Sequence, residues 1–147
     1  MNILTYITAI SMIFLSSVLH SAIAQEKIGN GLEVDKTVHN FGDILLDNGP
    51  VSCTFTFRNT GNQPIVIYNA VTTCGCTKAT WTKEPILPGK TGTVSATYSN
   101  DEGPYPFDKS ITVYMSEPKK PVILKMRGIC YEKKVPLSQI YTMRYGP

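Results

Sequence analysis

The chain has 147 residues, with 14 Lys and Arg against 11 Asp and Glu and a formal net charge of +3. This length supports one domain after removal of a targeting segment, and 42% hydrophobic against 17% charged residues argues against wholesale disorder. Four cysteines are too few for a small disulfide scaffold, and a charge of +3 gives no reason to expect nucleic-acid binding.

The first 24 residues contain no Asp, Glu, Lys or Arg, and a largely apolar run extends from Ile7 to Leu19. Ala22-Ile23-Ala24 places small residues where signal peptidase needs them. We therefore predict a signal peptide over residues 1–24, a mature chain beginning at Gln25, and export to an oxidising compartment. No Cys stands at the cleavage point, which argues against the lipoprotein route. An uncleaved anchor is the alternative, because no Lys or Arg precedes the run.

The mature chain shows strand patterns separated by turn residues. Residues 51–58 alternate between apolar and polar types, as in a strand with one buried face. Asn59-Thr60-Gly61-Asn62 then supplies turn chemistry. Leu32 and Val34 form an earlier short strand, with Phe41 and Ile44 following it. Later strands are predicted at 64–71, 78–82, 91–98, 107–115 and 122–130.

No segment has the apolar periodicity of an amphipathic helix. Six or seven short strands predict an all-β fold, an antiparallel immunoglobulin-like β-sandwich of about seven strands over residues 25–131. A small barrel is the alternative. The residues expected in the core are Val51, Phe55, Phe57, Ile65, Ile67, Val94, Ala96, Ile111, Val113, Leu124 and Met126.

Several motifs along the mature chain occur together in one known family. They are Phe41-Gly42-Asp43-Ile44, Phe55-x-Phe57-x-Asn59-Thr60-Gly61-Asn62, Pro64-Ile65-Val66-Ile67, Cys74-Gly75-Cys76-Thr77, Pro85-Ile86-x-Pro88-Gly89 and Lys109-Ser110-Ile111-Thr112-Val113. The chain from about residue 33 to 128 resembles the bacterial family called domain of unknown function 1573, which is related to immunoglobulin-like domains of the major sperm protein and Hydin type. The resemblance implies that fold and an exported, envelope-associated protein, and it implies no established activity. Cys53 and the segment after Gly128 lie outside the family pattern.

Residues suited to catalysis are sparse. His39 is the only histidine after Gln25, and the sequence around it contains no nucleophile elbow, phosphate loop or calcium loop. Asp101, Glu102 and Asp108 lie in or beside one loop and could hold a cation, but a solvated turn is the favoured explanation. We therefore expect neither enzymatic activity nor a cofactor.

Cys74-Gly75-Cys76 is the sharpest local feature. Two sulfurs at this spacing can bind a soft metal such as Cu⁺ or Zn²⁺, or form a thiol–disulfide switch, although the eleven-atom ring of a Cys-x-Cys disulfide is strained. Two packed thiols at a strand end are the third possibility.

The order of the predicted strands places four cysteines at one end of the domain. Cys53 begins one strand, Cys74 and Cys76 follow the next, and Cys130 ends the last. Alternation predicts that Cys53 and Cys130 both face inward. We therefore expect these two to lie close together and form a disulfide, which leaves Cys74 and Cys76 as the remaining pair. A four-cysteine metal site is a less favoured arrangement.

Charge is distributed unevenly along the mature chain. Residues 25–118 carry 7 basic and 10 acidic residues, whereas residues 119–147 carry 7 basic residues and one acid. The basic candidates for binding an acidic partner or anionic lipid are Lys119, Lys120, Lys133, Lys134 and Arg144. Lysines that protect sheet edges from aggregation are the alternative explanation. In the basic tail over 132–147, Tyr141, Met143 and Tyr145 alternate, which suggests a strand added to a partner's sheet.

These observations favour an exported, non-enzymatic immunoglobulin-like module that binds another protein of the cell envelope. The partner's identity and the oligomeric state do not follow from the sequence. The alternative is a thiol-redox or soft-metal protein that acts through Cys74 and Cys76.

Overall fold

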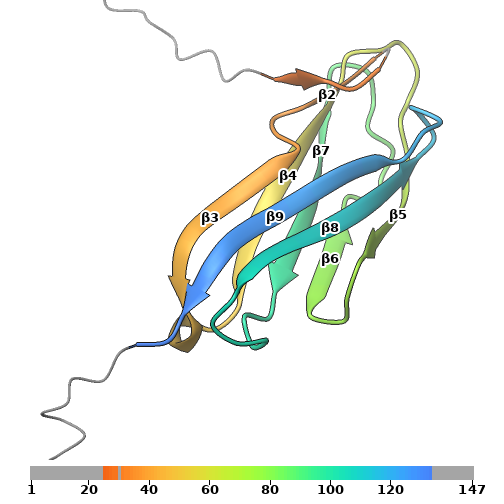
Figure 1. The fold of residues 1–147 in the computed structure, drawn as a ribbon. Helices are drawn as coiled ribbons and strands as arrows, with labels where there is room; N and C mark the ends of the chain where they lie inside the picture. Colours follow the sequence, from red (N-terminus) through yellow and green to blue (C-terminus); the bar gives the residue numbers. More distant parts are fainter. Residues whose placement is uncertain (1–24, 30, 134–147) are drawn as a thin grey trace, which may run out of the picture.

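The computed structural model of the protein describes residues 25–29 and 31–133, and this part forms a two-layered β-sandwich (Figure 1). Secondary structure other than strands is limited to one short 3₁₀ helix in this part of the chain. The elements are β1 (Glu26–Lys27), β2 (Leu32–Val34), β3 (Val38–Leu45), η1 (Leu46–Asn48), β4 (Val51–Asn59), β5 (Ile67–Thr72), β6 (Thr77–Trp81), β7 (Thr91–Tyr98), β8 (Pro106–Met115) and β9 (Val122–Tyr131).

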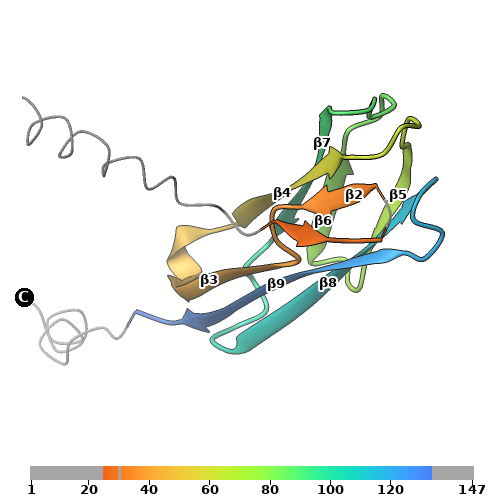
Figure 2. The same cartoon turned by 90° about the horizontal axis from the view of Figure 1, so that it is seen from above.

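The strands form two sheets that pack face to face. One sheet has five strands in the order β1-β2-β4-β7-β6, and the other has four in the order β3-β9-β8-β5. The two layers are distinct when the molecule is viewed from above (Figure 2). The predicted all-β sandwich is confirmed, and five of the six strands predicted from residue 51 onward lie within about a residue of their observed bounds. β5 begins later than expected, because Ile65 makes only an isolated bridge with Ile86.

One pairing departs from the expected antiparallel arrangement. β3 lies at the edge of the four-stranded sheet and runs parallel to β9, from Val38 opposite Lys125 to Leu45 opposite Tyr131. The register shifts between Asn40 and Asp43, where Gly42 has a φ of 67°. The side-chain amide oxygen of Asn40 accepts a hydrogen bond from the Gly42 N–H at 2.9 Å. This bulge interrupts the edge strand, a device that limits pairing with other chains.

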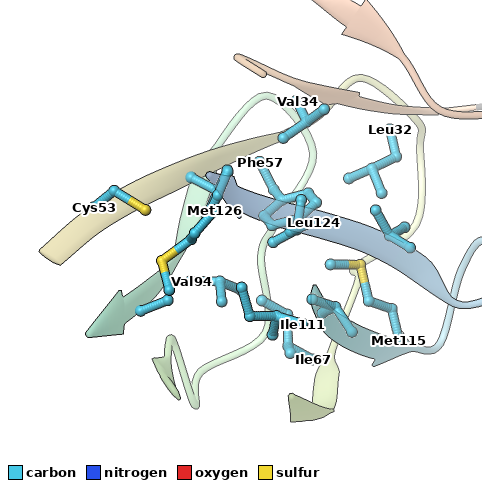
Figure 3. Packing of buried hydrophobic residues seen from close by; sticks show 14 of the residues in the cluster. Leu32, Val34, Cys53, Phe57, Ile67, Val94, Ile111, Met115, Leu124 and Met126 are labelled. Atoms are coloured by element: carbon cyan, nitrogen blue, oxygen red, sulfur yellow. The ribbon is translucent and has the colours of Figure 1, made fainter. Parts of the chain in front are cut away.

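The core lies between the sheets, where inward side chains from both layers meet (Figure 3). Ten of the eleven expected core residues are buried, and Phe55 and Phe57 of β4 have no exposed surface. Val51 is only half-buried, because it lies at the first position of β4. The alternation of the sequence thus identified the buried face of each main strand.

Asn59, the last residue of β4, is a fully buried polar residue at the end of the sandwich opposite the cysteines. Its side-chain amide donates to the carbonyl oxygens of Gln63 and Ile86, both at 2.8 Å. Its oxygen accepts from the Gly61 N–H at 2.9 Å. A buried amide needs such partners, and here they fasten the β4–β5 turn to the loop before β7.

Within residues 25–29 and 31–133, no helix is long and apolar enough to cross a membrane. The predicted signal peptide over residues 1–24 lies outside the described residues, as does the part of the basic tail after Lys133.

Candidate functional site

Three segments, which together carry the four cysteines, reach the same end of the sandwich (the lower end in Figure 1). β4 begins there just before Cys53, and the β5–β6 connection there contains Cys74 and Cys76. β9 finishes there just after Cys130. The strand predicted at 78–82 is present as β6, and the pairs β4–β7, β6–β7, β5–β8 and β8–β9 are all antiparallel, as the predicted order of the strands implies.

The cysteine pairing differs from the prediction. Cys74 and Cys76 form a disulfide with a Cα–Cα distance of 5.2 Å, and Cys53 and Cys130 are buried free thiols. The turn between β5 and β6, in which the Thr77 N–H donates to the Cys74 carbonyl oxygen, brings the two bonded residues together. The expected Cys53–Cys130 bridge is therefore wrong.

The reason is that alternation fixes the face a side chain takes but not its position across the sandwich. Cys53 lies in the five-stranded sheet opposite Ala96, in the electrostatic neighbourhood of Asp35 and Lys36. Cys130 lies in the other sheet, and its thiol donates to the Asn100 side-chain oxygen at 2.8 Å. Burial raises the pKa of Cys53 to about 11 and also raises the pKa of Cys130. Both thiols thus stay protonated at neutral pH.

A carboxylate lies beside the disulfide. One oxygen of Glu102 and the sulfurs of Cys74 and Cys76 all lie within 4.8 Å of one another. Glu102 Oε2 accepts hydrogen bonds from the Tyr98 hydroxyl at 3.1 Å and the Lys109 ammonium at 2.5 Å. The bond and charge of Lys109 lower the pKa of Glu102, so this carboxylate is ionised at neutral pH.

A hydroxyl group and a hollow also lie beside the disulfide. The Thr77 hydroxyl is 3.6 Å from the sulfur of Cys74 and 3.8 Å from that of Cys76. Next to Cys76 there is a hollow of about 130 Å³. Its lining residues are Pro50, Gly75, Cys76, Lys78, Thr97 and Ser99. The disulfide therefore has two neighbours, an ionised Glu102 and a surface depression large enough for a small side chain or a few water molecules.

Glu102 is a site residue that sequence reasoning considered only as one of three loop carboxylates. The structure does not bring those three together as a cation site. Asp108 accepts from Arg127 Nε at 2.8 Å, and the Asp101 carboxylate accepts from the Ser99 hydroxyl. Among the described residues, the Cys74–Cys76–Glu102 group is the one set of three or more potential metal ligands that lie close together. No local signal in the sequence links Glu102 to cysteines some 26 positions earlier.

His39 lies on β3, against an aromatic neighbour. Its ring packs edge-on against Phe41, with the centroids 4.4 Å apart. Burial, followed by the charge of Lys36, lowers the pKa of His39. The described contacts give it a packing role, and no nucleophile contacts it among them.

The basic candidates do not form one surface. Lys119 and Lys120 lie in the connection between β8 and β9, whereas Lys133 follows the far end of β9. The ten residues of β9 separate these positions by roughly 30 Å, from a rise of about 3.3 Å per residue. A single patch containing Lys119, Lys120 and Lys133 is therefore excluded. Lys134 and Arg144 lie outside the described residues.

A group of exposed apolar side chains, which we call the apolar face, lies on the outer surface of the four-stranded sheet. It consists of Tyr68, Val71, Tyr114 and Ile123, whose exposed fractions are 63%, 46%, 44% and 56%. The register places Val71 and Ile123 on either side of Thr112, and Tyr114 one row further along β8. The sequence analysis missed this face, because only the strand pairings show that these outward-facing apolar residues are neighbours.

Comparison with known proteins identifies the family. A model of the family described as "protein of unknown function (DUF1573)" matches residues 32–130. The chain belongs to this family. No protein with a curated description matches the chain significantly.

Solved structures similar to this DUF1573 protein share its fold at low identity. A protein of unknown function from Porphyromonas gingivalis W83 is 17% identical, with a TM-score of 0.59 over 67% of this chain and 46% of that one. The secreted serine protease VesC of Vibrio cholerae is 15% identical, with a TM-score of 0.55 over 78% of this chain and 26% of that one. VesB of the same species is 18% identical, with a TM-score of 0.54 over 68% and 32%. This chain spans less than half the length of each, and the likeness concerns the fold alone.

Proposed function

We propose that this DUF1573 protein is an exported, non-enzymatic module that binds another protein of the cell envelope through its apolar face. The observation that carries the proposal is the exposure of Tyr68, Val71, Tyr114 and Ile123 together on one sheet. Soluble proteins scatter single apolar residues over their surfaces, whereas a contiguous group marks a contact surface. Tyrosine is also among the residue types that contribute most to protein interfaces.

The surroundings of the apolar face favour a partner with acidic groups. Lys119 and Lys120 are exposed in the connection that joins the strands of Tyr114 and Ile123. An apolar centre with a charged rim is the usual organisation of an interface, and rim charges steer association with a complementary partner. The charge-free, apolar segment before Gln25 supports export, which gives the module access to envelope proteins. An anionic membrane surface is the other partner that the two lysines can contact.

The test is capture of partners from a native envelope extract with the tagged full-length protein. We expect the double variant Tyr114→Ser/Ile123→Ser to lose the captured protein, because it removes the centre of the apolar face. Tyr105→Ser is the matched control, since Tyr105 is 64% exposed but lies before β8 at the opposite end of the sandwich. Capture that survives the double variant, or that is lost equally in the control, would refute the assignment. Co-sedimentation with anionic vesicles distinguishes a lipid surface from a protein partner.

A thiol–disulfide function is the second candidate, and the Cys74–Cys76 disulfide beside Glu102 and the hollow favours it. Both bonded cysteines are partly accessible, so a thiol of another molecule can reach them. A dithiol would reduce the bond and become a disulfide itself. Alkylation after mild treatment of the folded protein with dithiothreitol tests this. If two thiols become reactive while the fold is retained, the result supports a switch. If no thiol becomes reactive, the result contradicts it.

A further inference from the structure

The cluster of Cys74, Cys76 and Glu102 has an arrangement that neither a structural disulfide nor a protein-binding surface requires. We propose that the reduced form of this protein binds a zinc ion through the two thiolates and the Glu102 carboxylate. This inference rests on the second candidate function, because the disulfide must open before its sulfurs can bind a metal. Because metal binding requires reduction of the disulfide, the metal site would be available only under reducing conditions.

The separations between the three groups suit a single ion. Zinc binds thiolate sulfur at about 2.3 Å and carboxylate oxygen at about 2.0–2.2 Å, so tetrahedral ligands lie roughly 3.5–4 Å apart. The three ligand atoms already lie within 4.8 Å of one another. Opening the disulfide lets the two sulfurs move apart to this spacing. All three residues lie in connections between strands, Glu102 between β7 and β8 and the cysteines between β5 and β6, so the core strands need not move.

The contacts of Glu102 orient it as a metal ligand. Tyr98 and Lys109 both bond to Oε2, which leaves Oε1 for an ion. A ligand whose other atom is held by surrounding hydrogen bonds is the usual arrangement in metal sites, where such contacts fix its direction. Tyr98 is almost completely buried, so the group that positions Glu102 is itself fixed by the core.

Charge and accessibility also fit zinc. Two thiolates and one carboxylate carry three negative charges, which Zn²⁺ and the adjacent Lys109 ammonium balance. The Thr77 hydroxyl lies close enough to both sulfurs to donate to a thiolate. The hollow beside Cys76 leaves room for a water molecule as the fourth ligand. Three protein ligands with one open position distinguish this arrangement from a closed structural zinc site.

The chemistry balances with a dithiol as the reductant. The dithiol supplies two electrons and two protons to the Cys74–Cys76 bond and becomes a disulfide, and the two cysteines become thiols. Binding of the ion then releases the two thiol protons. Reoxidation by a disulfide-bonded partner would return the protein to the bonded state and expel the ion.

The experiment uses full-length protein in three steps. The protein is reduced with dithiothreitol, freed of reductant without air, and its reactive thiols are counted by alkylation. Cobalt(II) is then added, because thiolate-bound tetrahedral cobalt gives a charge-transfer band and visible ligand-field bands, and zinc is added to displace it. We expect one cobalt per reduced chain, complete displacement by zinc, and no binding to the oxidised protein.

Variants assign the ligands. Cys76→Ser should abolish the charge-transfer band, and Glu102→Gln should weaken binding about tenfold or more. Glu84→Gln and Cys53→Ala are the controls and should bind cobalt as the wild type does, because Glu84 is exposed in the β6–β7 connection and Cys53 is a separate buried thiol. If native reduction exposes no reactive thiols, the thiol function and the metal site both fail. If two thiols appear but no cobalt binds, or Glu102→Gln binds as the wild type does, the metal site fails and the thiol function stands.

Discussion

Replacing the buried Asn59 tests how much one side chain contributes to the end of the sandwich opposite the cysteines. Asn59→Ala removes three hydrogen bonds, to Gln63, Ile86 and Gly61. At about 1 kcal/mol net for each bond, the loss is near 3 kcal/mol. The Ile86 carbonyl oxygen keeps its bond from the Ile65 N–H at 3.0 Å, and so it is not left unpaired. We therefore expect a decrease of about 2–4 kcal/mol in the free energy of unfolding.

Urea denaturation followed by the fluorescence of Trp81 measures this change. Asn62→Ala in the same turn is the control, because Asn62 is exposed, and it should change the stability by less than about 0.5 kcal/mol. A loss below about 1 kcal/mol for Asn59→Ala would show that these bonds exchange with water at no net gain, and would refute the reasoning.

Asn59→Asp separates hydrogen bonding from packing, because it keeps the shape of the side chain. A carboxylate at this position would face the carbonyl oxygens of Gln63 and Ile86, which only a donor can satisfy. The pKa of the new acid would therefore be higher in the folded state than in the unfolded chain. Such a group stabilises the fold below its unfolded pKa of about 3.9, and this contribution is lost as the pH rises. The difference in stability between Asn59→Asp and the wild type should consequently be larger at pH 7 than at pH 4, and a difference independent of pH would contradict the assignment.

Four further outcomes are expected. Phe55→Ala should lower the free energy of unfolding by about 3–5 kcal/mol, because it leaves a cavity in the core, and a change below about 1 kcal/mol would contradict its complete burial. Cys53 should resist alkylation in the folded protein. Because burial raises its pKa from 9.0 to about 11, the free energy of unfolding should fall as the pH rises through this interval. Cys53→Ala should reduce that fall, as measured by denaturation at several pH values. Deleting residues 132–147 should leave the melting temperature unchanged but weaken partner capture, whereas an unfolded product would place the tail in the sandwich. Amino-terminal sequencing of exported protein should find Gln25 or its cyclised form, and retention of Met1 would indicate an anchor.

The strands that could be predicted from the sequence are those with one buried face. The alternation from 51 to 58 defines both the extent of β4 and its inward residues, because the side-chain period of a strand is two. β3 was recognised only as Phe41 and Ile44, since an edge strand is accessible from more sides and its burial pattern is irregular. Its parallel pairing with β9 depends on which strand lies beside it, and local sequence does not contain that information.

The candidate site was predictable only in part for a similar reason. The neighbours Cys74 and Cys76 form a recognisable motif, and the order of the strands places the other two cysteines at the same end. Alternation does not decide which sulfurs pair, and Cys53 and Cys130 both remain free thiols. Glu102 reaches the disulfide through a contact between loops far apart in the chain, which alternation cannot reveal.

The buried asparagines are a case in which the sequence contained more than the first interpretation used. Continuing the inward series of β4 by one step reaches Asn59, and continuing that of β7 through Tyr98 reaches Asn100. A strand end is where backbone carbonyls lose their partners in the sheet, and an inward amide can supply donors to them. Asn100 does so with a φ of 57°, donating to the carbonyl oxygens of Leu45 and Gly49 at 2.9 and 3.1 Å. Because its oxygen also accepts from the Cys130 thiol, Asn100 ties the η1 segment to the last strand at the end of the molecule that carries the disulfide. At each end of the sandwich, an asparagine that continues the inward-facing series of a strand thus satisfies backbone carbonyl groups. At the cysteine end, the hydrogen bonds of Asn100 hold the start of the loop that carries Glu102.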